Sequence, residues 1–501
     1  MKRKRDSPQD HLSNLLDFCS DSQIKIDPRL HIDYDDDDAQ GKSIGVFLST
    51  KGNEDADDDI PPGTTVRIPK KSVLSVKSSN LTKYFGTDYE FAPYGLEAQL
   101  ELALAVYLED SKGSASPWHL YLKSLPEKTV DLPMFWTTKA IEEEEEGRDR
   151  DEDVQTALGW MTSSEIHRHL IPLNTVKEFF YDTVVSTMSD AATTTRKPSL
   201  HAYYRAFSLV SSRAFIVDAY HGLAMVPVAD AFNHIRDNHV HLETEFDVCP
   251  DCGSLRQCIH DHDRDLPEPS SETEDEEEEE EEELYYTMTT TTYIPIDTHH
   301  PSKRRTEIFN TYGTHLSNAQ LLNQYGFILD ANEADFVEFD DEDVLRIVGM
   351  GIDEEEQRNR NWGEQAKSVH VDSESELVYA SENAMDLRIS SDGRVSLGIV
   401  VFVYVGLGHT EEEEECLLQR WIDALMHREG LEREGLIKLA NVVISLCKAR
   451  LNDITQVDVD TILDDIPPTH WRTRAVGMHI MAERSILCSC ISSWEEYLLP
   501  T

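Results

Sequence analysis

Three cysteines and two histidines stand close together near the middle of the chain. Cys249 and Cys252 are two residues apart, and Cys258 is followed by His260 and His262. The C-x2-C-x5-C-x-H spacing offers four thiolate and imidazole ligands, the set that a tetrahedral structural zinc ion takes. Free thiols in a flexible loop are the alternative. Zinc would be held by Cys249, Cys252, Cys258 and either His260 or His262, with no open position for a catalytic water.

Five further segments combine polar and aromatic residues that could serve catalysis. In chain order they are Ser212-Arg213-Ala214-Phe215, Val226 to His234, Phe309 to Gly313, Ser317 to Leu322, and Tyr325-Gly326-Phe327. Each one alone is weak evidence, because an Asn-His pair after an apolar strand is often a core turn and a single tyrosine is often an ordinary core aromatic. Their occurrence together, in this order, indicates a common function.

These five segments resemble the SET-domain protein lysine methyltransferases, and within them the Rubisco large-subunit methyltransferase branch, which includes fungal enzymes that act on ribosomal proteins. Trp118 to Pro126 is similar to that branch's W-x-x-Y-x-x-x-L-P segment, and Ile60 to Ser75 is similar to its early strand pair. The resemblance covers residues 25 to 330 and continues into a helical domain similar to the family's substrate-binding domain. It implies transfer of a methyl group from S-adenosylmethionine to a protein lysine.

The resemblance also implies roles for individual residues. Tyr312 matches the catalytic tyrosine, whose hydroxyl lies beside the transferred methyl group. Asp230, Phe215 and Phe327 are expected along the channel that takes the substrate lysine. Contacts to the cofactor are implied for Lys42, Ser43, Ile44, Ser212, Arg213, Asn233, His234 and Tyr325. Among these, the guanidinium fork of Arg213 suits the carboxylate of the cofactor.

Two positions depart from the family's pattern. The Gly-x-Gly loop that approaches the cofactor reads Ser43-Ile44-Gly45, so its first glycine is replaced. Glu245 stands where the family has an additional tyrosine. A non-catalytic acidic protein that uses the SET fold to bind basic partners is therefore the second reading of the sequence. A zinc-dependent recognition module is the third.

Lysine methylation places physical demands on such a site. A lysine with a pKa of about 10.4 must lose its proton, which costs about 4.6 kcal/mol at pH 7. A narrow channel that desolvates the ammonium lowers this cost and fixes the line of attack. Aromatic walls orient the cation and exclude water. We expect Tyr312, Phe215, Tyr325 and Phe327 to supply them.

The charge of the chain is strongly negative and unevenly distributed. Its 501 residues include 46 Lys and Arg against 96 Asp and Glu, a formal charge of −50, and ten consecutive acids run from Glu274 to Glu283. Such blocks repel themselves and mark solvated or inserted segments. The balance argues against direct nucleic-acid binding. A negative surface can steer a basic protein partner, so we expect a ribosomal protein or a histone-like tail as substrate.

The apolar pattern predicts an α+β protein of two domains. After a basic tail and first helix in residues 1–24, a SET domain over 25–330 is expected to be mostly β. It would carry a helical insert at 87–200 and the Cys/His and acidic insertion at 246–284. Leu/Ile stripes in Glu/Lys/Arg-rich helices predict a packed helical bundle over 331–501, and the resemblance implies that it is an all-α substrate-binding domain.

The N-terminus and the cysteine content suggest a location. No apolar run approaches the ~20 residues of a bilayer-spanning helix, and the first residues lack the apolar stretch of a signal peptide. Eight cysteines without a framework spacing agree with a reducing compartment. Lys2 to Arg5 fit either a nuclear import signal or a solvated tail. We expect a monomer without a membrane partner, in the nucleus or cytoplasm and preferably the nucleus.

Overall fold

The computed structural model describes most of the chain. The described residues are 8–34, 44–49, 60–79, 81–85, 89–136, 148–190, 197–244, 248–254, 258–260, 285–294, 305–348, 377–381, 386–406, 425 and 433–499. Lys42, Ser43, Glu245 and His262 lie outside them, as do the basic quartet and the run of ten acids. The chain packs as two compact units, residues 1–132 with 172–314 and residues 133–171 with 315–501.

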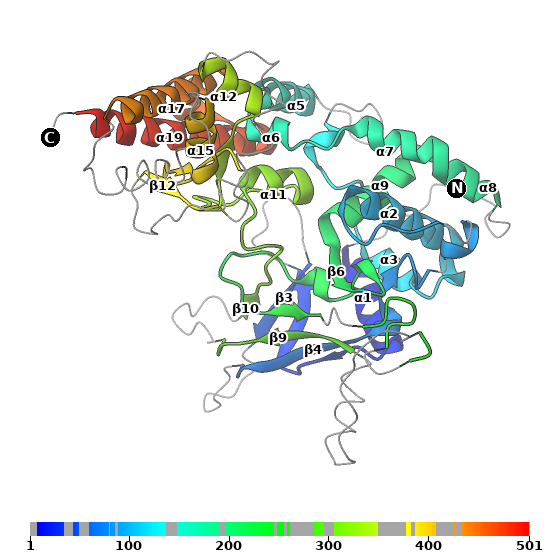
Figure 1. Cartoon of the computed structure of the whole chain (residues 1–501). Helices are drawn as coiled ribbons and strands as arrows, with labels where there is room; N and C mark the ends of the chain where they lie inside the picture. The colour runs from blue at the N-terminus through cyan, green and yellow to red at the C-terminus, as the bar shows by residue number, and fades with distance from the viewer. Residues whose placement is uncertain are drawn as a thin grey trace. The chain divides into compact units, whose positions relative to one another are not determined.

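The helices of the first unit form two packed pairs, α2 with α9 and α1 with α3. Every residue of α2 from Leu100 to Glu109 is buried, and its two buried glutamates accept hydrogen bonds, Glu101 from Tyr89 and Glu109 from Ser116. The Ser199 hydroxyl caps α9 by accepting from the backbone N–H of Ala202. These helices are α1 (Pro8–Asp21), α2 (Gly95–Lys112), α3 (His119–Ser124), α7 (Leu173–Phe179), α8 (Val185–Asp190) and α9 (Leu200–Arg213) (Figure 1).

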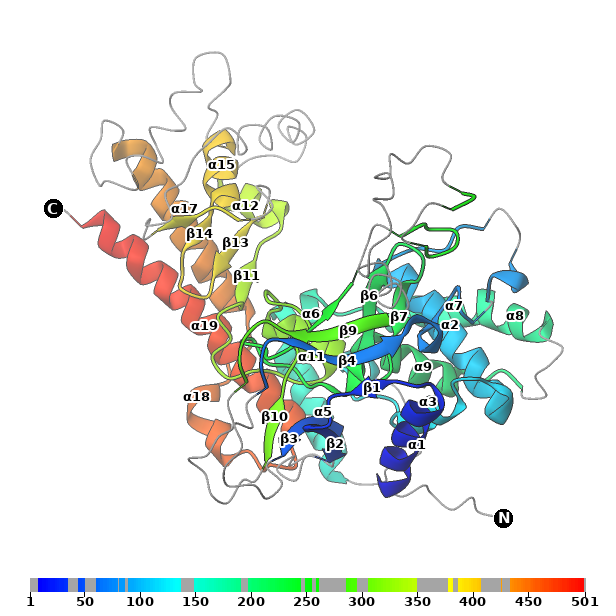
Figure 2. The same cartoon turned by 90° about the horizontal axis from the view of Figure 1, so that it is seen from below.

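The strands of the first unit form three small antiparallel sheets, in the orders β1-β4-β9-β8, β10-β3-β2 and β5-β7-β6. The strands are β1 (Lys25–Ile26), β2 (Leu30–Tyr34), β3 (Ile44–Ser49), β4 (Gly63–Pro69), β5 (Leu74–Ser75), β6 (Ala214–Asp218), β7 (Gly222–Met225), β8 (His241–Glu243), β9 (Tyr285–Thr290) and β10 (Arg305–Ile308). Most pairings join distant segments: β3 lies between β2 and β10, with Val46 opposite both Ile32 and Ile308 (Figure 2). This pairing brings the strand that contains Gly45 next to the segment that leads to Tyr312.

The second unit is built around the long helix α19 (Trp471–Leu498), which packs against α5 (Arg148–Met161) and α17 (Arg433–Asp453). The α15 segment (Leu397–Gly406) is almost wholly apolar and its described side chains are buried, so it belongs to the core of this unit. The remaining helices are α6 (Glu165–Arg168), α11 (Asn318–Tyr325), α12 (Asp341–Val348) and α18 (Val459–Ile462).

The α+β class is confirmed, but the expectation of an all-α C-terminal domain is wrong. A four-stranded sheet in the order β11-β13-β14-β12 lies in the second unit. Its strands are β11 (Phe336–Glu338), β12 (Val378–Tyr379), β13 (Arg388–Ser390) and β14 (Val395–Ser396). Segments of two or three residues are too short to display the alternation that reveals a strand in sequence.

Residues 133–171 pack with the C-terminal part of the chain, although the sequence suggested that they belong to the helical insert. Asp153 in α5 accepts from the Thr473 backbone N–H at 2.9 Å and pairs with Arg472 at 3.1 Å. Ala157 and Trp160 complete the contact in the same hydrophobic core. Among the described helices none is long and apolar enough to cross a membrane.

Candidate functional site

The segment that carries Asn233 and His234 begins with a strained turn after β7. Buried Val228 has a φ of 73°, a conformation that β-branched residues rarely adopt and that costs about 1–3 kcal/mol. The backbone N–H of Ala231 donates to the Val228 carbonyl at 3.0 Å and closes a single 3-10 turn. Strain of this kind persists where the surrounding structure fixes the backbone, and here the turn holds Asp230 and the residues that follow it.

The backbones of the Asn-His and tyrosine segments are hydrogen-bonded to each other. Asn310 donates its N–H to the Asn233 carbonyl at 2.9 Å, and Ile235 donates to the Asn310 carbonyl at 3.0 Å. These bonds make His234 and Asn310 an isolated parallel bridge. Two motifs that are far apart in sequence therefore form one local structure.

His234 and Tyr312 are in direct contact. The Tyr312 backbone N–H donates to His234 Nδ1 at 3.0 Å, and the two rings stack with centroids 5.1 Å apart. Burial lowers the pKa of His234, so the ring is neutral at pH 7 and can accept this bond. The Tyr312 hydroxyl donates to the Phe232 carbonyl at 3.3 Å. Burial raises the pKa of Tyr312 to about 12 against the opposing effect of Arg213, so the hydroxyl keeps its proton at neutral pH.

The side chain of Asn233 is held by a carboxylate that the sequence analysis did not single out. Asn233 Nδ2 donates to Glu307 Oε1 at 2.6 Å. Glu307 lies on β10 opposite Phe47, and a Cβ placed on Gly45 would come within 2.8 Å of the same oxygen. Gly45, the glycine that this chain keeps of the Gly-x-Gly pattern, thus makes room for the Asn233–Glu307 contact. Only the position of Glu307 just before the Phe309 motif could have pointed to it.

Arg213 and Asp230 form a second part of the site together with Tyr121. Buried Asp230 accepts from the Tyr121 hydroxyl at 2.9 Å, while Arg213 Nη1 donates to the Asp230 carbonyl at 2.9 Å and lies 3.5 Å from its carboxylate. Burial raises the pKa of Asp230, and Arg213 and Tyr121 oppose that shift. Tyr121 belongs to the W-x-x-Y segment, so its place in that motif was a usable signal for a site residue.

A pocket of about 280 Å³ brings three of the expected residues together, Ile44, Arg213 and Asp230. Its lining residues are His11, Leu15, Tyr34, Ile44, Ser124, Leu125, Pro126, Arg213, Asp230 and Ala231. Among the described residues, Arg213 Nε and Nη2 have no protein partner, so two guanidinium donors remain for a ligand carboxylate. A larger pocket of about 490 Å³ lies over β4, β8 and β9 and has none of the expected site residues in its lining. We therefore place the site at the smaller pocket.

The remaining expected residues lie apart from these contacts. The Ser212 hydroxyl donates to the Ser208 carbonyl at 2.8 Å within α9. Phe215 lies on β6 opposite Ala224 and is partly exposed. Tyr325 ends α11 in the second unit, and its ring centroid lies 6.2 Å from that of Phe327. The roles proposed for Ser212, Phe215, Tyr325 and Phe327 stay predictions.

The Cys/His cluster is also brought together in the first unit. The ligand atoms of Cys249, Cys252, Cys258 and His260 all lie within 4.8 Å of one another. The thiol of Cys249 is buried, whereas Cys252 and His260 are exposed. This arrangement agrees with the spacing that suggested zinc.

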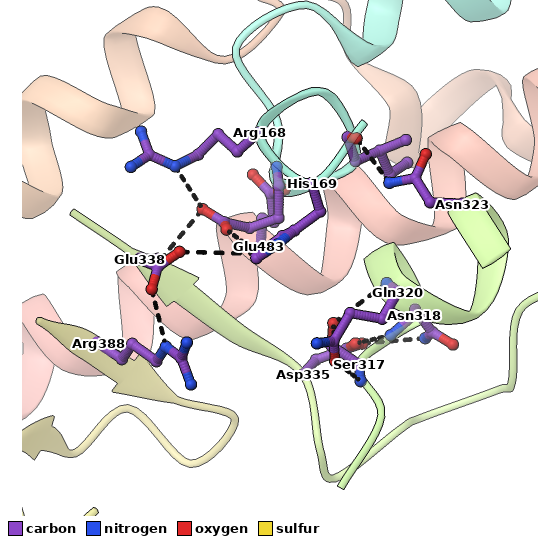
Figure 3. Close-up of polar contacts among 12 residues, drawn as sticks. Arg168, His169, Ser317, Asn318, Gln320, Asn323, Asp335, Glu338, Arg388 and Glu483 are labelled. Carbon is purple, nitrogen blue, oxygen red and sulfur yellow. Dashed lines mark hydrogen bonds and ion pairs between the residues drawn. The ribbon is translucent and has the colours of Figure 1, made fainter. Parts of the chain in front are cut away.

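A second group with possible metal ligands lies in the second unit and was not predicted. Glu165, His169 and Glu338 place their ligand atoms within 4.8 Å of one another. Their carboxylates are already paired with guanidinium groups: Arg450 lies 2.8 Å from Glu165, and Arg388 lies 3.0 Å from Glu338, beside His169 (Figure 3). Because these cations balance the acids, we interpret the group as a structural network that joins α6, α17 and the small sheet.

Comparison with known proteins gives short or distant sequence matches. No family model matches the chain. A stretch of 52 residues, 10% of this chain and 9% of the relative, is 46% identical to ribosomal lysine N-methyltransferase 3 of Saccharomyces cerevisiae. A stretch of 230 residues, 44% of this chain and 42% of the relative, is 25% identical to uncharacterized protein C16C6.01c of Schizosaccharomyces pombe. The chain thus matches less than half the length of either relative.

Solved structures match nearly the whole chain. The crystal structure of the SET domain of LSMT bound to lysine and AdoHcy covers 97% of this chain and 91% of its own, with a TM-score of 0.60 and 14% identity. A structure of Rubisco LSMT bound to sinefungin and monomethyllysine covers 97% and 92%, with a TM-score of 0.58 and 14% identity. The chain therefore has the SET-domain fold of the Rubisco LSMT structures, as its sequence motifs implied.

Proposed function

We propose that this protein is an S-adenosylmethionine-dependent protein-lysine N-methyltransferase. The observation that carries the proposal is the contact between His234 and Tyr312, which fixes the matched catalytic tyrosine against the Asn-His segment. The nearby pocket adds a guanidinium with two donors left for a carboxylate, on Arg213. The solved structures of the same fold, bound to AdoHcy and lysine, support this assignment.

The residues of the site fit a sulfonium cofactor and an amine substrate. Bound S-adenosylmethionine would supply an electrophilic methyl group. Arg213 would hold the cofactor's carboxylate, and Asn233, fixed by Glu307, would keep the neighbouring backbone in place. The protonated Tyr312 hydroxyl presents a neutral oxygen at the reacting centre, where weak directional C–H···O contacts orient a methyl group. Buried Asp230 would favour the ammonium form of an approaching substrate lysine. The lysine must then lose its proton before it can accept the methyl group.

We further propose that the substrate is a basic protein of the large ribosomal subunit. The formal charge of −50 favours encounter with a basic partner. The short match to ribosomal lysine N-methyltransferase 3 of Saccharomyces cerevisiae supports a ribosomal target over a histone-like tail. We place this reaction in the nucleus or the cytoplasm, with the nucleus preferred because of the basic quartet Lys2 to Arg5.

Incubation with methyl-labelled S-adenosylmethionine and a fungal ribosomal extract tests the proposal. We expect one discrete, small, basic labelled protein that is absent when the Tyr312→Phe variant replaces the wild type. Absence of label with the wild type, together with absence of cofactor binding in calorimetry, would contradict the enzyme assignment and favour an acidic SET-fold protein that only binds basic partners. Absence of label despite cofactor binding would contradict the ribosomal substrate.

A further inference from the structure

The cluster of three thiols and one imidazole has the dimensions of a tetrahedral zinc site. His260 Nδ1 lies 3.8 Å from Cys249 Sγ and 3.7 Å from Cys258 Sγ. With Zn–S of about 2.3 Å and Zn–N of about 2.0 Å, a tetrahedral ion separates a sulfur and a nitrogen ligand by roughly 3.6 Å. The sulfur of the fourth ligand, Cys252, lies within 4.8 Å of each of the other three ligand atoms. The side chains are thus arranged around a space that one ion would fill.

The backbone between the first ligands forms a tight turn. The Gly253 N–H donates to the Cys249 carbonyl at 2.7 Å, and the Cys249 N–H donates to the Ser254 carbonyl at 2.8 Å. Gly253 has a φ of +78°, in the left-handed region that glycine adopts without cost. This turn presents Cys249 and Cys252 to the same side, which is the form of a zinc knuckle.

The turn packs against the hairpin that connects β6 to β7. A Cβ on Gly253 would lie 3.2 Å from the Tyr220 ring, so the glycine allows close contact with that tyrosine. The Tyr220 and His221 backbone N–H groups both donate to Asp218, at 3.0 and 2.7 Å. Asp218 in turn accepts from the Tyr286 hydroxyl on β9. The cluster is therefore seated on a buried polar group that connects two sheets of the first unit.

The cluster lies in the connection between β8 and β9, where a bound metal ion would stabilise the fold. Strands β8 and β9 are paired, yet Glu243 ends the first and Tyr285 begins the second. Closing so long a connection costs conformational entropy, and a metal cross-link within it reduces the unfolded chain's freedom. The protein would supply all four ligands of the ion. No coordination position would be left for a water, so the ion would take no part in methyl transfer.

We propose that Cys249, Cys252, Cys258 and His260 bind one structural zinc ion that fastens the β8–β9 connection to the Tyr220 hairpin. Elemental analysis of the full-length protein should find about one zinc per chain. The double variant Cys249→Ser/Cys258→Ser should lose it, whereas Cys488→Ser, which removes an exposed thiol of the second unit, should retain it. Equal zinc in all three proteins would overturn the proposal.

Cobalt substitution keeps the proposal testable if the double variant does not fold. Full-length protein depleted of metal with a chelator and then titrated with Co²⁺ should develop intense visible absorption and a thiolate charge-transfer band, saturating at one equivalent. Zinc should then displace the cobalt. Metal removal should lower the melting temperature by several degrees and leave calorimetric binding of S-adenosylmethionine within about twofold. Weak octahedral cobalt spectra, or no change in melting temperature, would contradict the site.

Discussion

The backbone N–H of Tyr312 donates to Nδ1 of His234 at 3.0 Å, and the two rings stack. This single contact explains why the histidine and the tyrosine occur together in the sequence pattern. The accepting nitrogen requires a neutral ring with its proton on Nε2, and burial favours that state by lowering the pKa of His234. The histidine therefore sets the position of the tyrosine backbone, while the tyrosine hydroxyl donates to the Phe232 carbonyl.

Removal of the Tyr312 hydroxyl should impair catalysis more than binding. The Tyr312→Phe variant keeps the ring stack and the backbone bond but loses the bond to the Phe232 carbonyl. We expect the turnover number to fall about ten- to hundredfold, since one polar contact in the transition state contributes about 1–3 kcal/mol. Calorimetric affinity for S-adenosylmethionine should change less than twofold. Tyr293→Phe, at a tyrosine 67% exposed, is the control, and equal turnover of both variants would refute the role of Tyr312.

A methyl group on Gly45 should weaken cofactor binding without unfolding the protein. In Gly45→Ala the new Cβ would lie 2.8 Å from Glu307 Oε1 and 3.1 Å from the Phe47 ring, so the carboxylate must move away from Asn233. We expect the dissociation constant of S-adenosylmethionine to rise about tenfold, which corresponds to about 1.4 kcal/mol. Gly159→Ala is the matched control, because nothing lies within 4 Å of its Cβ position and alanine favours its helix. Unchanged affinity in Gly45→Ala would show that the Asn233–Glu307 pair does not support the cofactor site.

Replacement of the Arg213 guanidinium should also weaken the binding of S-adenosylmethionine. Arg213→Lys keeps the positive charge beside Asp230 but loses the planar fork, whose separate nitrogens can bond the Asp230 carbonyl and a ligand carboxylate in fixed directions. We expect roughly tenfold weaker binding of S-adenosylmethionine, and a smaller loss for an analogue without the carboxylate. Arg346→Lys, at an exposed arginine of the second unit, serves as the control. An equal loss of affinity for S-adenosylmethionine and for the analogue would show that Arg213 does not bind the carboxylate of the cofactor.

The second unit should become less stable as the pH rises above neutrality. His479 lies 2.9 Å from Glu483, and both side chains are about 1% exposed. Burial lowers the pKa of His479, but the pairing with Glu483 and the nearby Asp335 outweigh it and raise the pKa above 6.5. The stabilisation is therefore complete below the unfolded value of about 6.5 and is lost as the pH rises through the folded pKa.

Urea denaturation between pH 6 and pH 9 checks this dependence. We expect the His479→Gln variant to be about 3 kcal/mol less stable than the wild type at pH 6, because it leaves a buried carboxylate unpaired. The difference should shrink as the pH increases. A difference that stays constant or grows with pH would contradict the charged pair.

Local patterns predicted the elements that have a clear period. The helical spacing of Leu96, Leu100, Leu104 and Leu108 falls in helix α2, and the short apolar segment from Ile44 to Leu48 falls in strand β3. We also expected Asn233, His234 and Tyr312 to lie in one site, because the five motifs occur in the order that is typical of the SET-domain family. In the structure the Asn233 carbonyl accepts from Asn310 and His234 accepts from the Tyr312 backbone, while the roles expected of the three side chains stay predictions.

Long-range pairing could not be derived in the same way. Glu307 meets Asn233 only because β10 pairs with β3, and an isolated glutamate carries no signal of that register. The segment with Asp153 packs in the second unit, where the Asp153 carboxylate forms an ion pair with Arg472, far away in the sequence. Such contacts depend on the tertiary arrangement of the chain and not on local propensity.

The location of the transferred methyl group tests the central claim most directly. We would purify the protein labelled in a ribosomal extract and find the modified side chain by tandem mass spectrometry, with wild type and Tyr312→Phe side by side. A methyl group on a lysine side chain of one basic ribosomal protein, strongly reduced with the variant, is the predicted result. Modification of another residue type, or equal labelling by both proteins, would contradict a lysine methyltransferase site built on His234 and Tyr312.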